Sequence, residues 1–378
     1  MTEGSYCADC REILTQQEKI PATGHSYAYK TVDAATHAVT CTKCDYTATE
    51  AHTYEDGNCI CGEAEIKEPV IDESLVINHT LNLASDISVN FAVRAELLQG
   101  YSTHCMVCEI PVYEGNVQTG TKTVTLSPVL NGYFYYYTLT GLTAIQMGDV
   151  VTAQLRMVKD GGEYCSKVDT YSVAQYAYTQ LNKDGADPKL KALCAELLRY
   201  GSAAQIFKGY RTDALADGSM TEEQRAYLAD LSAVTFGNTN RQLGDLSNPT
   251  AKWLGKSLIL DSKVTLRYVV DLTACETTDN ITLRVRYRDY AGAEQTAVLT
   301  EAEPYGSVDG YYSFDFSGLL AAELRTVLQA AVYAGDTRIS NTLEYSVDTY
   351  GNNKAGTLDT LCRALMAYSD AAKTFFAK

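Results

Sequence analysis

The stretch from Cys7 to Cys61 holds the side chains whose types and spacing suit metal chemistry. Half of the chain's 12 cysteines and three of its 5 histidines lie in it. Structural zinc takes four Cys or His ligands in a tetrahedron, and two thiolates two residues apart in a tight turn reach one ion. The sequence therefore predicts structural zinc, with these candidate ligands: Cys7, Cys10, His25, His37, Cys41, Cys44, His52, Cys59 and Cys61.

The candidate ligands are enough for two tetrahedral sites with one ligand left over. One grouping makes a four-thiolate site of Cys41, Cys44, Cys59 and Cys61 and leaves Cys7, Cys10 and His25 with either His37 or His52. The alternative is two or three disulfides with bystander histidines, but a disulfide scaffold does not require histidines interleaved with the cysteines. Neither zinc site needs an open coordination position, so we expect a structural role and no hydrolytic chemistry.

The Cys/His segment has few Leu, Ile or Phe side chains, so it needs metal ions or disulfides as cross-links to fold.

Beyond residue 68 the hydrophobic pattern changes to strand-like alternation, and an internal repeat appears. A helical stretch, Tyr171–Phe207, recurs as Tyr345–Phe376, and both begin with YSVxxY. Strand-like segments before them match at a constant shift of 177, as in Ser85–Val93 against Ser262–Val270. Alternating strands separated by Gly, Asn and Asp turns are typical of antiparallel sandwiches.

The repeat predicts the fold class and the domain plan. We expect a multidomain, mainly β protein with some α structure: a small zinc-ribbon-like segment, then two tandem antiparallel β-sandwich domains, each capped by a two-helix couplet. The expected domains are a Cys/His spacer at 1–66, a first repeat at 74–210, a connector with a short helix at 211–250, and a second repeat at 251–378.

Helix signals are clear in both couplets. Asp187-Pro188 supplies an N-cap and a first-turn proline, and Thr357 is the expected cap in the second copy. TEEQRAYLADL in the connector begins with a capping box and predicts a short helix. Cys194 and Cys362 lie on the apolar stripes of the couplets, so we interpret them as core residues.

The Cys/His motifs also resemble a known group of sequences. CxxC followed by PATGHSY, and HxxxCxxC followed by HTYEDGNCICGE, are similar to small Cys/His repeats in large secreted or cell-surface proteins of gut-dwelling Gram-positive anaerobes. The β-plus-helix unit resembles a module near the C-terminal ends of such proteins. The resemblance implies an extracellular location, a metal-stabilised spacer and further domains in a longer chain, but no activity. Cys59-x-Cys61 is one residue tighter than the usual CxxC.

Motifs for enzymatic chemistry are absent from the sequence. It has no GxSxG, P-loop, GxGxxG or HExxH. His104-Cys105-x-x-Cys108 falls on an expected strand, where Cys105 and Cys108 point to opposite faces and cannot share one ion. We therefore expect no enzyme activity, although the carboxylate pair of a glycan-active enzyme has no sequence signature that would locate it.

An aromatic run from Tyr133 to Tyr137 is the strongest candidate for a binding surface. The alternation turns Phe134 and Tyr136 outward, where flat aromatic rings suit stacking on a sugar or anchoring a protein partner. The alternative is that the helices or the other repeat cover this face and make the two rings part of the core. The single tryptophan, Trp253, is interpreted as a domain-junction anchor.

Composition and charge exclude several classes of partner. A formal net charge of -16 would repel nucleic acid and anionic membranes, and no apolar run approaches the roughly 18 to 20 residues that span a bilayer. We expect non-catalytic extracellular recognition of a host or dietary glycan or glycoprotein, with the duplication offering avidity. The alternatives are a structural stalk or assembly module of a larger surface protein, and a glycan-active enzyme with unidentified carboxylates.

Overall fold

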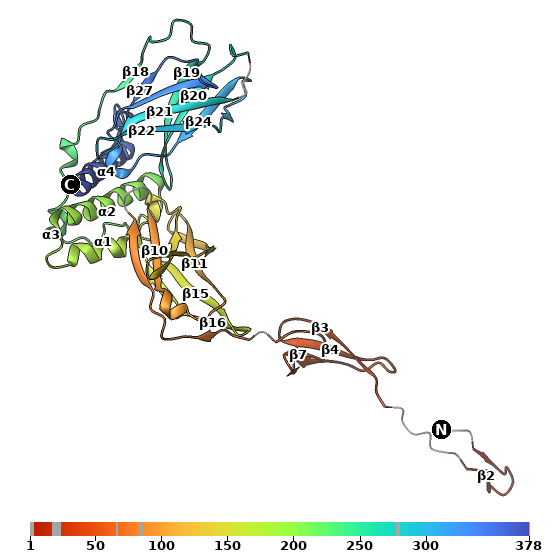
Figure 1. Ribbon diagram of the computed structural model, residues 1–378. Helices are drawn as coiled ribbons and strands as arrows, with labels where there is room; N and C mark the ends of the chain where they lie inside the picture. The colour runs from red at the N-terminus through yellow and green to blue at the C-terminus, as the bar shows by residue number, and fades with distance from the viewer. Residues whose placement is uncertain (1–3, 17–23, 66, 83–86, 277–279, 378) are drawn as a thin grey trace. The chain divides into compact units, whose positions relative to one another are not determined.

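A computed structural model describes residues 4–16, 24–65, 67–82, 87–276 and 280–377 (Figure 1). The chain divides into two compact units, Met1–Glu68 and Pro69–Lys378. Strands in several antiparallel sheets make up most of the regular structure, so the prediction of a mainly β protein with some helices is confirmed. Among the described residues, no helix is long and apolar enough to cross a membrane.

The first unit consists of short strands and has almost no apolar core. Its strands are β1 (Ser5–Tyr6), β2 (Ile13–Thr15), β3 (Tyr27–Thr31), β4 (Thr36–Cys41), β5 (Thr47–Ala51), β6 (Tyr54–Glu55) and β7 (Asn58–Cys59). They form a β1–β2 hairpin, a β3-β4-β5 sheet and a β6–β7 hairpin. The buried side chains among its described residues are His37, Val39, Cys41 and Cys59. Three of these four are candidate metal ligands, so the fold of this unit depends on them.

The first repeat contains two sheets. The four-stranded sheet has the order β13-β14-β10-β9, from β9 (Asn78–Asn82), β10 (Ser88–Arg94), β13 (Val129–Asn131) and β14 (Phe134–Leu139). The six-stranded sheet comprises β8 (Val70–Ile71), β11 (Thr103–Glu114), β12 (Val117–Leu126), β15 (Val151–Lys159), β16 (Gly162–Cys165) and β17 (Asp169–Tyr171). All pairings are antiparallel except the short parallel contact of β8 with β16. Inward side chains of both sheets belong to one buried cluster.

The second repeat copies this arrangement. One sheet holds β19 (Lys252–Leu260), β20 (Val264–Asp271), β23 (Glu303–Pro304) and β24 (Tyr311–Phe316). The other holds β18 (Asn240–Gln242), β21 (Ile281–Arg288), β22 (Glu294–Leu299), β25 (Leu328–Ala334), β26 (Thr337–Arg338) and β27 (Leu343–Tyr345). Phe91 pairs with Tyr137 in the first repeat, and Tyr268 pairs with Phe314 in the second. The register therefore keeps the shift of 177 that the sequence predicts.

The helices are α1 (Val173–Asn182), α2 (Pro188–Lys208), α3 (Glu222–Arg225) and α4 (Gly356–Phe376), with 3-10 turns η1 (Ala95–Leu98), η2 (Ala144–Gln146), η3 (Leu231–Ala233), η4 (Ala321–Glu323) and η5 (Val347–Gly351). The predicted α2 cap is confirmed, since the Asp187 carboxylate accepts from the Lys189 N–H at 2.8 Å. The Thr221 and Gln224 capping box of α3 is confirmed too.

The second couplet differs from the prediction. Its first member is the 3-10 turn η5 and not an α-helix, and α4 begins at Gly356 after an Ala355 N-cap, so the Thr357 cap is wrong. Asn353 and Gly356 have φ values of 59° and 61°, in the left-handed region that interrupts a helix. Gly351 is also confined, because a Cβ there would lie 2.2 Å from the Phe236 ring. The chain therefore turns where the first repeat continues α1.

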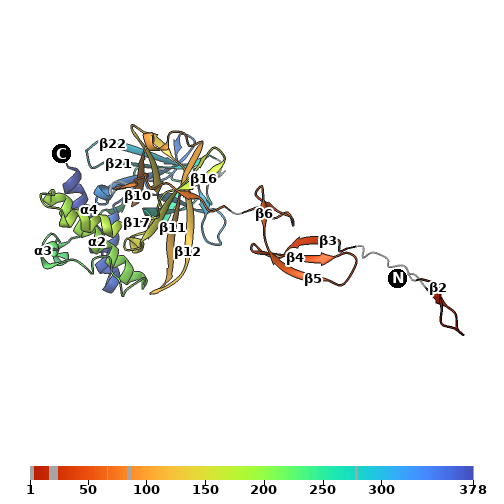
Figure 2. The same ribbon diagram turned by 90° about the horizontal axis from the view of Figure 1, so that it is seen from below.

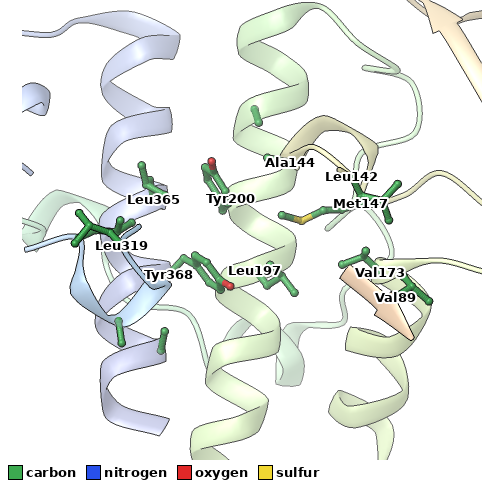
Figure 3. Close-up of a cluster of buried hydrophobic side chains, with 14 of the residues drawn as sticks. Val89, Leu142, Ala144, Met147, Val173, Leu197, Tyr200, Leu319, Leu365 and Tyr368 are labelled. Carbon is green, nitrogen blue, oxygen red and sulfur yellow. The ribbon is translucent and has the colours of Figure 1, made fainter. Parts of the chain in front are cut away.

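Helices α2 and α4 lie side by side and join the two repeats (Figures 1 and 2). At the centre of the contact, the rings of Tyr200 and Tyr368 stack at 5.8 Å and 7° (Figure 3). Leu197 and Leu365 are buried beside them. Both repeats thus contribute to one continuous core.

The connector between the repeats is anchored at both ends. At one end, Arg211 donates to the buried Asp149 carboxylate at 2.6 Å. At the other, β18 adds an edge strand to β27 of the second repeat, and Asp245 accepts from the Thr342 N–H at 2.9 Å. The segment predicted as a polar connector is therefore partly built into the second repeat.

Candidate metal centres and an aromatic sheet face

A four-donor group lies where the β3-β4-β5 sheet meets the β6–β7 hairpin. The ligand atoms of His37, His52, Cys59 and Cys61 all lie within 4.8 Å of one another. The Nδ1 atoms of the two histidines are 3.3 Å apart, and each lies 3.4 Å from one cysteine Sγ. Two imidazoles and two thiols around one centre are a donor set that can hold a metal ion.

Contacts around the four-donor group orient its histidines. His52 donates from Nε2 to the Asp33 carbonyl oxygen at 2.9 Å, and this bond raises the pKa of His52. Because the ring proton is on Nε2, the Nδ1 atom keeps a free electron pair, and this pair faces the other donors. His37 Nε2 is buried and has no hydrogen-bond partner, with the nearest Glu50 carboxylate oxygen 4.0 Å away. Both imidazoles thus present the same nitrogen to the centre.

A three-donor group lies at the other end of β4. The ligand atoms of His25, Cys41 and Cys44 lie within 4.8 Å of one another, and no fourth Cys, His, Asp or Glu joins them within the described parts of the chain. The Lys43 N–H donates to Cys41 Sγ at 3.4 Å. Hydrogen bonding from this N–H is the main reason that the pKa of Cys41 is lowered to about 6, against the opposing effect of desolvation. A thiol of low pKa is a ready metal ligand.

The predicted four-thiolate grouping is wrong. Cys41 and Cys44 belong to the three-donor group, whereas Cys59 and Cys61 belong to the four-donor group. The reason is the length of β4: His37 and Cys41 share one face of the strand, but four residues of strand separate them by about 13 Å. One ion therefore could not take ligands from both ends of β4. Cys7 and Cys10 belong to neither group and lie between β1 and β2.

The two aromatic residues predicted to face outward do so. In the four-stranded sheet, Phe91 and Tyr137 pair on the inward, fully buried face, so Tyr136 and Phe134 point to the opposite side. Their rings are half-buried, lie 6.3 Å apart with a tilt of 51°, and are not part of the buried cluster. The packing therefore contradicts the alternative that the Phe134 and Tyr136 rings belong to the core.

Polar side chains lie near the two rings on the same side of the sheet, together with the apolar Ala92 and Val129, which pair with Tyr136. Arg94 lies with its guanidinium carbon 5.8 Å from the Phe134 ring centre, and the Thr138 hydroxyl donates to the Asn90 side chain at 2.7 Å. We call this surface the aromatic–polar face, and its members are Asn78, Thr80, Asn90, Ala92, Arg94, Val129, Asn131, Phe134, Tyr136 and Thr138. All of them except Ala92 are exposed or half-buried.

The second repeat does not present the same surface. Tyr311 stands where the first repeat has Phe134, but Ser313 replaces Tyr136. Asp315 stands in place of Thr138 and accepts two hydrogen bonds from Arg267, at 2.7 and 2.6 Å. The corresponding face thus carries an Arg–Asp pair and has no ring in the place of Tyr136, so the duplication offers no second copy of the aromatic–polar face.

Other residues singled out from the sequence have structural roles. Cys108 is fully buried, as are Cys194 and Cys362, and burial raises the pKa of the Cys194 thiol to about 12. Trp253 lies in β19 and donates to the Asn341 carbonyl at 2.8 Å. It anchors parts of the second repeat to each other and not one domain to the next.

One polar pair was missed by sequence reasoning. His79 on β9 pairs through Nε2 with Asp169 on β17 and stacks on Tyr171 at 4.3 Å. The partners are 90 residues apart in the chain, so no local pattern connects them. The pair ties the two sheets of the first repeat together.

Comparison with known proteins adds no assignment: no family model matches this chain, and no curated protein matches it.

Proposed function

We propose that the chain is a non-catalytic recognition protein whose aromatic–polar face binds a glycan or the glycan of a glycoprotein. The observation that carries this proposal is that Phe134 and Tyr136 point outward on a sheet face whose strands also carry amide and hydroxyl side chains. In this proposal the two sheets of the first repeat pack as a sandwich that holds the face rigid.

The face has the two kinds of group that sugars need. A pyranose ring has apolar C–H surfaces that stack on aromatic rings, and Phe134 and Tyr136 offer such rings at little entropic cost. Its hydroxyls need donors and acceptors, and the amide of an Asn side chain supplies both. Asn78, Asn90 and Asn131 lie on the strands around the rings. The open sheet surface suits an extended glycan chain.

The ion we propose for the four-donor and three-donor groups is zinc. Thiolates with imidazoles in tetrahedral surroundings are the usual ligands of structural zinc, and the four-donor group has no position left for substrate. The cysteines in both groups lie against histidines, and a disulfide would leave those imidazoles without a role. The first unit then acts as a metal-stabilised spacer of an extracellular protein.

A structural stalk is the second candidate, and a specific feature favours it. Helices α2 and α4 fuse the cores of the two repeats around the Tyr200 and Tyr368 rings. A module joined in this way would hold its ends at a fixed orientation and would suit the positioning of another domain.

Binding of the full chain to immobilised mucin and plant glycans separates the two candidates. We expect saturable retention by one glycan class and at least about tenfold weaker binding for Phe134→Ala and for Tyr136→Ala, because truncated aromatic anchors typically cost 2 kcal/mol or more. Tyr311→Ala, the matched change at the corresponding position of the second repeat, should bind like the wild type. Retention that survives both first-repeat changes would refute the assignment of the face, and no retention at all would favour the stalk.

A further inference from the structure

The turn between β1 and β2 has the same hydrogen bonds as the turn that supplies two ligands of the four-donor group. In the first turn, the Cys7 N–H donates to the Glu12 carbonyl at 2.8 Å and the Arg11 N–H donates to the Cys7 carbonyl at 2.9 Å. In the second turn, the Cys59 N–H donates to the Glu63 carbonyl at 2.7 Å and the Gly62 N–H donates to the Cys59 carbonyl at 2.8 Å.

The backbone conformation agrees as well. The residue directly after the second cysteine is left-handed in both turns, with φ values of 62° at Arg11 and 94° at Gly62. The turn at Cys7 is longer by one residue, which gives it the usual Cys-x-x-Cys spacing of a thiolate pair that shares one ion. Cys7 and Cys10 therefore have the spacing and turn conformation of a thiolate pair that forms half of a metal site.

Among the described residues, no second pair of free Cys or His donors completes this half site, and the three-donor group has room for only one more ligand. His79 is held by Asp169 and His104 by Tyr137. Among the described residues outside the first unit, the remaining cysteines are buried or half-buried and form no metal-binding group. The sequence has no Cys or His at 1–3, 17–23, 66, 83–86, 277–279 or 378. The complement that this chain can offer is the same thiol pair on a second copy.

The hairpin also exposes apolar side chains that a partner would cover. Tyr6, Ile13 and Leu14 are 69%, 68% and 66% exposed. A two-stranded hairpin cannot bury its own apolar residues, and clusters of exposed apolar side chains mark contact surfaces. Here they adjoin the thiol pair, and Cys10 is itself exposed. Two independent features of one short hairpin thus point to a contact with another polypeptide.

We propose that two copies of the chain bind each other through the β1–β2 hairpin, with one zinc ion held by Cys7 and Cys10 of both copies. A twofold axis through the ion would supply four thiolates, which is a complete tetrahedral zinc site, and each copy would use the same surface, as in most dimers. Tyr6, Ile13 and Leu14 would be buried in the contact. The inference rests on the proposed zinc chemistry of the first unit.

Sedimentation equilibrium and zinc analysis of the full chain test the inference. With zinc, we expect twice the 41.3 kDa mass of one chain, and with EDTA the single mass. Cys7→Ser/Cys10→Ser should stay monomeric with zinc and lose one ion for every two copies, while the matched control Cys105→Ser should dimerise. Ile13→Ser/Leu14→Ser should weaken the dimer and keep its zinc dependence.

Two results would overturn it: a wild-type chain that stays monomeric with zinc bound, or a double cysteine variant that dimerises like the wild type. A monomer that retains zinc at the four-donor group would contradict only the dimer. A chain that takes up no zinc would contradict the proposed zinc sites as well, and neither result bears on glycan binding.

Discussion

Truncation of Tyr200 should destabilise both repeats together. Tyr200 lies on α2 of the first repeat and is only 5% exposed, and its ring stacks on that of Tyr368 on α4 of the second repeat. Tyr200→Ala removes this ring from the place where the two cores meet, so the buried face of α4 loses packing contacts with α2. The change therefore tests whether the α2–α4 contact couples the repeats energetically.

The expected loss is about 3 kcal/mol. Buried Phe or Trp replaced by Ala costs about 3–5 kcal/mol, and a stacked aromatic pair accounts for about 0.5–1.5 kcal/mol of such losses. Tyr200 borders a cavity of 670 Å³ that Phe207, Leu258 and Leu361 also line. Water can enter the enlarged space from this cavity, which places the loss at the lower end of the range.

Two optical probes distinguish the repeats in this test. Trp253 is the only tryptophan and reports on the second repeat, whereas far-ultraviolet circular dichroism reports on both. In denaturant titrations of Tyr200→Ala, both transitions should move to lower denaturant by the same free energy. Tyr133→Ala removes the same ring at an 87% exposed position and should change stability by less than about 0.5 kcal/mol. A Trp253 transition that stays in place in Tyr200→Ala would refute the coupling.

Three further changes test other parts of the structure. Gly201→Ala should lower the melting temperature despite a gain of about 1 kcal/mol in helix propensity, because the new Cβ would lie 2.8 Å from Met147 Sδ and 3.3 Å from the Ala144 carbonyl; a rise would contradict this packing. Desolvation would raise the pKa of Asp245, but hydrogen bonds from Thr342 and Arg338 outweigh it and lower the pKa to about 2. Its stabilisation, about 1 kcal/mol after allowance for exposure, should thus be complete above the ordinary pKa of about 4 and vanish as the pH falls through about 2. The stability difference from Asp245→Asn, measured by urea unfolding, should shrink over that range, and a constant difference would exclude the linkage. His52→Ala should remove one zinc ion per chain and make the first unit sensitive to protease while Trp253 fluorescence stays unchanged; unaltered zinc content would exclude His52 as a ligand.

Local patterns in the sequence were sufficient for much of the fold. The shift of 177 predicts the register of both repeats because strand pairing follows the side-chain alternation, which is a local property. The same alternation turns Phe134 and Tyr136 away from the core. Asp187-Pro188 determines the start of α2 because capping depends on neighbouring residues only. The η5 turn escaped prediction, since the Phe236 ring that confines Gly351 comes from a distant part of the chain.

The sequence by itself determined which side chains are candidate metal ligands and which aromatic rings point away from the core, because both depend only on residue type and on the alternation along each strand. Only the tertiary structure decided how the ligands are shared. The span of β4 separates His37 from Cys41, and the hairpin that brings Cys59 to His37 joins residues 22 positions apart. The tertiary structure also decided that α2 packs on α4 and leaves the aromatic–polar face outside the core. Both outcomes depend on contacts between distant segments, which no local pattern specifies.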